Sequence, residues 1–109
     1  SGYSMTINGT TLTNGAFTIA TTSANTASTV GSEQFGLRMT ASGGSGTVSV
    51  PYAAAGYAFD SLNFPDQVAA ATVASANTTY SVRYIANIGS ATEAGAYTST
   101  LTYVATANF

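Results

Sequence analysis

Two long stretches in the last third of the chain alternate with a period of two. One set of alternating positions in these stretches is Tyr80, Val82, Tyr84, Ala86 and Ile88, followed by Tyr97, Ser99, Leu101, Tyr103 and Ala105. Threonine fills most of the positions between the members of the second set. Successive side chains of a strand point to opposite faces, so the pattern predicts two strands with one packed and one solvated face. We expect the two strands to form an antiparallel pair joined by a turn over residues 89–95.

Shorter alternating segments precede this pair. Residues 3–8, 35–41 and 47–52 are predicted strands, and Pro51 places the last of these at a sheet edge or a strand end. Residues 10–13 and 16–21 are short β segments bounded by two Asn-Gly turn signals. Residues 67–75 fit either helix or strand, and a strand or irregular chain is preferred to a helix. An irregular segment is expected to send four side chains into the core: Tyr57, Phe59, Leu62 and Phe64.

Seven or eight short strands at this spacing predict an all-β fold. The architecture we expect is an immunoglobulin-like antiparallel β-sandwich of about seven to eight strands. A length of 109 residues suits one hydrophobic core, so residues 1–109 are taken as a single β-sandwich domain.

The chain is poor in charge and rich in small polar residues. Only 6% of the residues are charged, whereas the chain holds 19 Thr and 13 Ser. Two basic residues, Arg38 and Arg83, are too few for the positive surface that nucleic-acid binding needs. No apolar run approaches the roughly 20 residues of a membrane span, so no membrane insertion is expected. A weakly charged surface favours self-association, and the composition suggests a secreted, cell-surface protein whose signal peptide has been removed.

The residue inventory argues against enzymatic chemistry. The chain has no His and no Cys, which excludes a Ser-His-Asp triad, a thiol nucleophile and a His-based zinc site. Its four acids are Glu33, Asp60, Asp66 and Glu93. Two carboxylates would suit a glycosidase, and Asp60 with Asp66 would suit calcium, but neither pair has the surroundings of a known site. We therefore expect no enzyme, and no catalytic, cofactor or metal residues.

The segment before the last strand resembles a known element. Thr92-Glu93-Ala94-Gly95-Ala96-Tyr97 is similar to the T-x-A-G-x-Y element that precedes the terminal strand in many secreted bacterial sandwich domains, including pilus and coat proteins. Four further segments match in order: residues 1–7, 33–37, 84–88 and 101–106. Together they resemble a group of surface proteins from candidate-phylum bacteria. The resemblance implies a β-sandwich surface protein and transfers no catalytic or binding residue.

The same element has a structural interpretation that does not depend on the resemblance. Gly95 tolerates backbone conformations that a β-carbon would penalise. Tyr97 is expected to place its ring in the core while its hydroxyl binds backbone near the turn, as in a tyrosine corner. Gly95 and Tyr97 are therefore the predicted structural turn residues.

Two functions from different classes remain. The first is a structural subunit of an extracellular filament, pilus or surface coat, a homo-oligomer or polymer that assembles by β-strand complementation. Its expected donor is the N-terminal segment, residues 1–8, with Tyr3, Met5 and Ile7 inserting; otherwise these residues form the first strand of their own domain. The second is a displayed adhesin or glycan-binding module of a larger surface protein, with a surface glycan or host receptor as partner. Three tyrosines are its exposed candidates, Tyr3, Tyr52 and Tyr57, whereas Tyr80, Tyr84, Tyr97 and Tyr103 are expected to pack in the core.

Overall fold

The chain folds entirely from β-strands and loops. A computed structural model describes residues 1–109 and contains no α-helix. The elements are β1 Gly2–Gly9, β2 Thr13–Asn14, β3 Phe17–Thr18, β4 Gln34–Ser42, β5 Thr47–Val48, the 3-10 turn η1 Ser61–Asn63, β6 Asp66–Ala71, β7 Thr79–Asn87 and β8 Leu101–Asn108. None of its helical segments is long and apolar enough to cross a membrane. The expected all-β sandwich is therefore confirmed, with eight strands.

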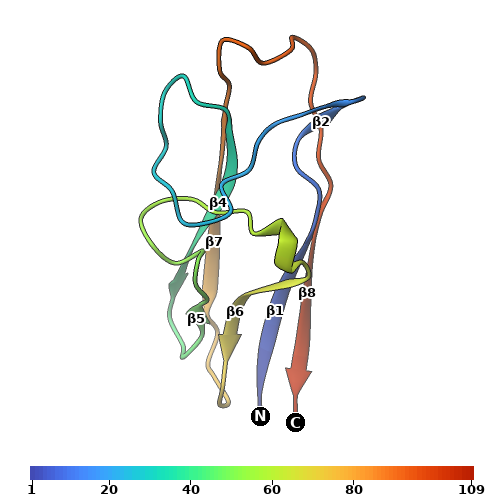
Figure 1. Cartoon of the computed structure of the whole chain (residues 1–109). Coiled ribbons are helices and arrows are strands. Elements are labelled where there is room, and N and C mark those ends of the chain that lie inside the picture. The colour runs from blue at the N-terminus through green and yellow to red at the C-terminus, as the bar shows by residue number, and fades with distance from the viewer.

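Two sheets carry the core. The larger has the order β5-β6-β1-β8 and the smaller consists of β4 and β7; every ladder in both is antiparallel. A third, minor sheet is formed by β2 and β3. The free ends of β1 and β8 lie at one end of the sandwich, and the long loops lie at the other (Figure 1). The molecule is elongated, with principal extents of 48 × 25 × 20 Å.

The predicted pairing of the last two long strands is wrong. β7 pairs with β4 along its whole length, and β8 pairs with β1. The turn over residues 89–95 therefore crosses from one sheet to the other instead of closing a hairpin (Figure 1). Alternation fixes which side chains share a face but not which strand lies alongside, so both arrangements satisfy the same pattern.

Several strand boundaries also differ from the sequence prediction. The strand expected over residues 47–52 is limited to Thr47–Val48, because the chain turns before Pro51. The ambiguous segment 67–75 forms a strand, β6, over Asp66–Ala71. The last strand begins at Leu101, so Tyr97 lies in the connection that precedes it.

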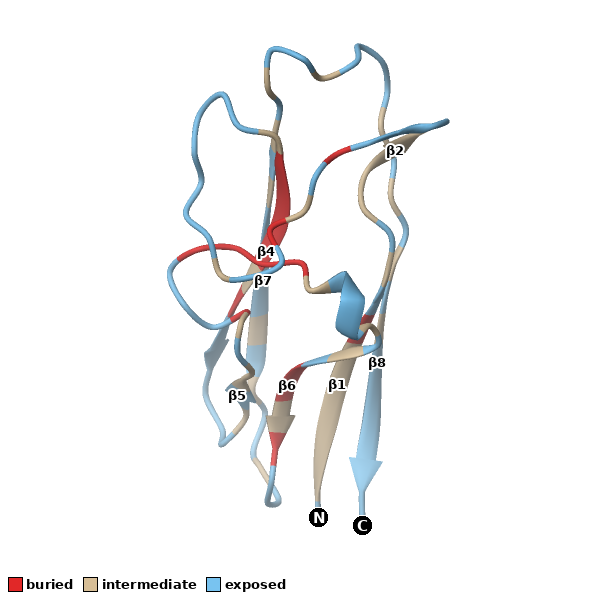
Figure 2. Cartoon of the chain, in the orientation of Figure 1, coloured by how far each residue is buried: buried red, intermediate tan, exposed pale blue.

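One cluster of buried side chains fills the space between the sheets. Its members are Ile7, Ile19, Phe35, Leu37, Met39, Tyr52, Ala58, Phe59, Val68 and Ala69. β4 contributes three of these side chains from alternate positions, whereas β8 is exposed over most of its length (Figure 2). Phe59 is fully buried and Phe64 packs against the cluster, as expected, but Leu62 is 93% exposed on η1. The core expectation for Leu62 is therefore wrong.

Candidate assembly interface

β1 is the first strand of the sequence but occupies a central place in the larger sheet. It forms ladders with β6 on one side and with β8 on the other (Figure 1). Gly2 lies so close to β6 that an added β-carbon would fall 2.0 Å from the carbonyl oxygen of Ala71. The two ladders and this close approach fix β1 between its neighbours. Removing β1 would leave facing edges of β6 and β8 without hydrogen-bond partners.

The three predicted assembly residues share the inner face of β1. Ile7 is completely buried in the core cluster, and Met5 packs against that cluster while remaining partly exposed. The hydroxyl of Tyr3 is 2.6 Å from that of Tyr80, and the two rings meet edge to face at 6.5 Å. The structure thus brings Tyr3, Met5 and Ile7 into one row. This row lies within the parent domain, where these side chains complete its own core.

The sandwich is open along the side where β7 and β8 face each other. β7 pairs only with β4 and β8 only with β1, so each strand has one unpaired edge. Val82 and Tyr84 stand opposite the core residues Met39 and Leu37 and therefore share their inward face. They are nevertheless 36% and 44% exposed.

A pair of tyrosines spans this opening. The hydroxyl oxygens of Tyr84 and Tyr103 lie 2.5 Å apart. Burial, then the hydrogen bond with Tyr84, raises the pKa of Tyr103 well above its ordinary value of 10.0. Burial, then the hydrogen bond with Tyr3, raises the pKa of Tyr80 to about 12. The hydroxyls of Tyr103 and Tyr80 therefore stay protonated at neutral pH and serve as uncharged hydrogen-bonding groups.

The exposure of Val82 and Tyr84 has no signal in the sequence. Their alternation is the same as that of a covered strand, so the pattern does not report how far the opposite sheet covers them. The expectation that Tyr84 packs in the core is therefore wrong, whereas Tyr80, Tyr97 and Tyr103 are partly buried and pack against the core cluster. Sequence reasoning missed this open side entirely.

The predicted turn residues lie at the loop end of the sandwich. Gly95 has a φ of +148°, and a β-carbon there would fall 2.1 Å from the side-chain nitrogen of Asn14. The hydroxyl of Tyr97 donates to the carbonyl of Glu93 at 2.7 Å while the ring packs against the core cluster. This is the geometry of a tyrosine corner. It fixes the start of the connection into β8.

Glu33 holds the same loop from the other side. Its two carboxylate oxygens accept hydrogen bonds from the hydroxyl of Thr92 at 2.7 Å and the backbone N–H of Ala20 at 2.8 Å. The two hydrogen bonds lower the pKa of Glu33 below its ordinary value of 4.5, and the bond from Thr92 has the larger effect. Glu33 therefore ties the β7–β8 connection to the chain before β4.

Two of the remaining acids, Asp60 and Asp66, bind different partners. Asp60 accepts a hydrogen bond from Asn63 at 2.8 Å, and Asp66 accepts one from the hydroxyl of Tyr52 at 2.7 Å. No three Asp or Glu side chains gather in one place.

The expected exposed tyrosines do not form a sugar-binding platform. Tyr52 is completely buried, Tyr57 is buried beneath Arg38, and Tyr3 is only partly exposed. The interpretation of Tyr52 and Tyr57 as exposed candidates is therefore wrong, whereas the expectation that Tyr57 enters the core is confirmed. Tyr52 lies beyond the end of β5, after the chain has turned, so the strand predicted over residues 47–52 does not reach it. Comparison with protein-family models, with curated proteins and with solved structures found no match.

Proposed function

We propose that this chain is a structural subunit of an extracellular filament, pilus or surface coat, and that its copies assemble by exchanging β1. The observation that carries the proposal is the position of β1, which is central in the larger sheet, between β6 and β8, and contributes a fully buried Ile7. When β1 leaves its own sandwich, it exposes a groove between β6 and β8. It can then occupy the same groove in a second copy.

The energetics of such an exchange are favourable at high local concentration. An exchanged β1 makes the same ladders with β6 and β8 and buries the same side chains, so the contacts within each sandwich are conserved. Residues 10–12 connect β1 to β2 and would be the hinge of the exchange. Passing β1 from each copy to the next gives a head-to-tail contact, which produces an open filament when the rotation does not close.

The surface supports the same proposal. Natural sheets protect their free edges with charge, especially Lys, and this chain has no Lys. The open side between β7 and β8 adds unpaired edges and partly exposed apolar side chains to this weakly charged surface. The similarity of residues 92–97 to an element of secreted bacterial sandwich domains is in keeping with an extracellular location.

A displayed adhesive or glycan-binding module is the second candidate. The observation that favours it is the partly exposed ring of Tyr84 at the open side, since sugars stack on aromatic rings. It requires a monomeric domain with a surface glycan or host receptor as partner, and it predicts no strand exchange.

Cysteine cross-linking tests the exchange directly, because the natural chain contains no cysteine. Thr6 of β1 and Val104 of β8 stand directly opposite each other and line the same shallow depression on the outer face. Directly opposed strand residues lie within the range that a disulfide spans. The experiment mixes two single variants, Thr6→Cys and Val104→Cys, under assembly conditions and then oxidises them.

Strand exchange predicts a disulfide between the two different variants. A mixture of Thr6→Cys with Thr40→Cys is the matched control, because Thr40 lies on β4, which β1 does not pair with. The double variant T6C/V104C, oxidised as a monomer, should lose filament formation as judged by electron microscopy and light scattering. Equal cross-linking in both mixtures, or filaments from the locked double variant, would contradict the proposal.

A further inference from the structure

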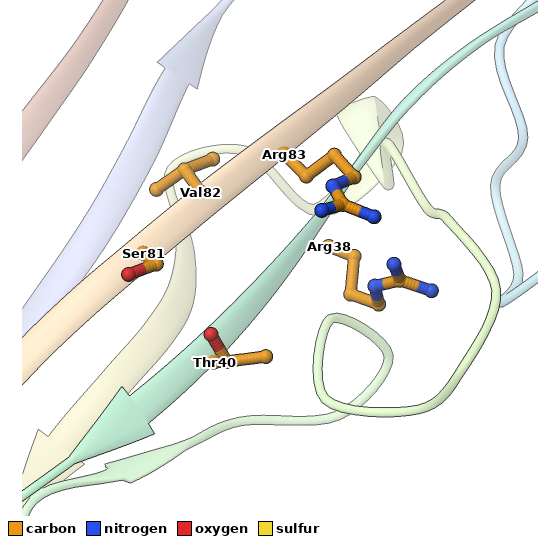
Figure 3. A pocket seen from close by; sticks show the side chains of 5 residues that line it. All are labelled: Arg38, Thr40, Ser81, Val82 and Arg83. Atoms are coloured by element: carbon orange, nitrogen blue, oxygen red, sulfur yellow. The ribbon is translucent and has the colours of Figure 1, made fainter.

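The only two basic side chains of the protein stand directly opposite each other. Arg38 of β4 and Arg83 of β7 are cross-strand partners in the smaller sheet. Because Leu37 and Met39 point into the core, the neighbouring Arg38 points outward, and Arg83 points outward with it. Both guanidinium groups lie over the same outer face (Figure 3). A chain with a net charge of −2 thus places all its positive side chains at one point.

The pair is not neutralised from within the chain. The guanidinium of Arg38 lies 4.8 Å from the centre of the Tyr57 ring and donates a hydrogen bond to the carbonyl of Ala55. Three of the four acids accept hydrogen bonds from other groups, as described above, and none accepts one from Arg83. Like charges directly opposite each other in a sheet are destabilising, so this arrangement stores an unfavourable interaction.

The surroundings of the two arginines suit an oxyanion. The next pair along the ladder is Thr40 and Ser81, whose hydroxyls extend the same face. A depression of about 210 Å³ is lined by Arg38, Thr40, Ser81, Val82 and Arg83 (Figure 3). Guanidinium groups bind carboxylate and sulfate oxygens through two parallel hydrogen bonds, and hydroxyls add further donors.

We propose that the outer face of β4 and β7 binds an oxyanion, a carboxylate or sulfate group, between Arg38 and Arg83. The bound group relieves the repulsion of the arginines and satisfies the free donors of Arg83. The depression is open on its outer side, so the oxyanion is either a free ion or a substituent of an acidic polysaccharide. This site is on the opposite side of the smaller sheet from the core and is independent of the exchange of β1.

The test measures binding of the intact protein to dextran sulfate and to polygalacturonate, with uncharged dextran as the control polymer. Inorganic sulfate, matched in ionic strength against chloride, is the arm for a free ion. We expect both acidic polymers to bind despite the negative charge of the protein, and Arg83→Gln to weaken that binding about tenfold, the effect of losing a charge-assisted hydrogen bond. Arg83→Lys retains the positive charge but lacks the two parallel donors of the guanidinium group, so its affinity should lie between those of the wild type and Arg83→Gln.

Each outcome is decisive. Binding of the polymers that depends on Arg83 supports the site with a polysaccharide as its source, and Arg83-dependent binding of inorganic sulfate alone supports it with a free ion. Equal affinity of the wild type and Arg83→Gln for every anion would overturn the proposal, as would no binding at all. Arg38→Gln is a second variant, and urea unfolding shows whether losing its contacts with Ala55 and Tyr57 has altered the fold.

Discussion

The hydroxyl groups of Tyr84 in β7 and Tyr103 in β8 form a hydrogen bond of 2.5 Å across the open side of the sandwich. β7 and β8 belong to different sheets and share no ladder, so this bond links two free edges through side chains alone. Tyr103 stands opposite Ile7 in the β1–β8 ladder, which connects the pair to the core.

The tyrosine pair should couple the two sheets energetically. Tyr84→Phe and Tyr103→Phe each remove one hydroxyl and leave the other without its partner. We expect each substitution to lower the free energy of unfolding by about 1 kcal/mol, with the double variant costing less than the sum. Urea unfolding of the four proteins of a double-mutant cycle measures the coupling. Strictly additive losses would show that the two hydroxyls do not interact.

Stability should fall at alkaline pH. Burial is the main cause that raises the pKa values of Tyr52, Tyr80 and Tyr103 in the folded state, that of Tyr80 to about 12. Tyrosines of the unfolded chain have their ordinary pKa of 10.0. Above pH 10.0 the unfolded chain therefore binds fewer protons than the folded one. The stabilisation is present in full below that pH and is lost as the pH rises through about 12. Urea unfolding from pH 8 upward tests this, and Tyr103→Phe should make the decline shallower.

Gly95 should not tolerate a side chain. Gly95→Ala introduces a β-carbon at a φ of +148° and within 2.1 Å of the Asn14 side-chain nitrogen, so we expect a loss of about 1–3 kcal/mol in the free energy of unfolding. Gly31→Ala is the matched control, because Gly31 also has a positive φ but has open space around it. Adding Asn14→Gly to Gly95→Ala should recover part of the loss. Equal losses in the free energy of unfolding for the two alanine variants would show that the contact with Asn14 does not cause the loss at Gly95.

Ile7 should contribute far more to stability than an exposed residue of the neighbouring strand. Ile7→Ala leaves a cavity beside fully buried side chains and should cost about 2–5 kcal/mol. Val104→Ala, at a position that is half exposed, should change the free energy of unfolding by less than about 0.5 kcal/mol. Chemical denaturation of the monomer gives both values. A small effect at Ile7 would mean that β1 does not fill this core.

Glu33 should make stability sensitive to acid. The folded state lowers its pKa below 4.5, mainly through the hydroxyl of Thr92, so the stabilisation is present above pH 4.5 and is lost as the pH falls through the folded value. Glu33→Gln should lower the thermal midpoint at neutral pH and weaken its dependence on acid. Glu93→Gln is the control, because it removes the same charge from a side chain without a hydrogen bond. An equal effect of both substitutions would show that the hydrogen bonds of Glu33 do not cause the acid sensitivity.

The strands were predictable where the alternation is long. Residues 3–8, 35–41 and 80–87 lie in strands as predicted, because long period-two patterns favour extended backbone. Ile88 lies outside β7, and residues 97–100 precede β8, so the ends of the two last runs were misplaced. Leu62 was misjudged because it lies in irregular chain, where spacing does not report which side chain points inward, and Tyr52 because the strand predicted over residues 47–52 ends at Val48. The pairing of β7 with β8 was wrongly inferred from proximity in sequence, whereas β4 and β1 are their true neighbours.

By itself, the sequence determined the fold class, the inward face of each long strand and the lack of His and Cys chemistry, because these follow from residue type and a local period. Tertiary structure alone decided the pairing partners, the central place of β1, the open side beside Tyr84 and the meeting of Arg38 with Arg83. Each of these depends on which distant segments lie together. Cross-strand hydrogen bonds are made by the backbone, which is the same at nearly every residue, so local sequence leaves the choice of neighbour to the packing of the whole chain.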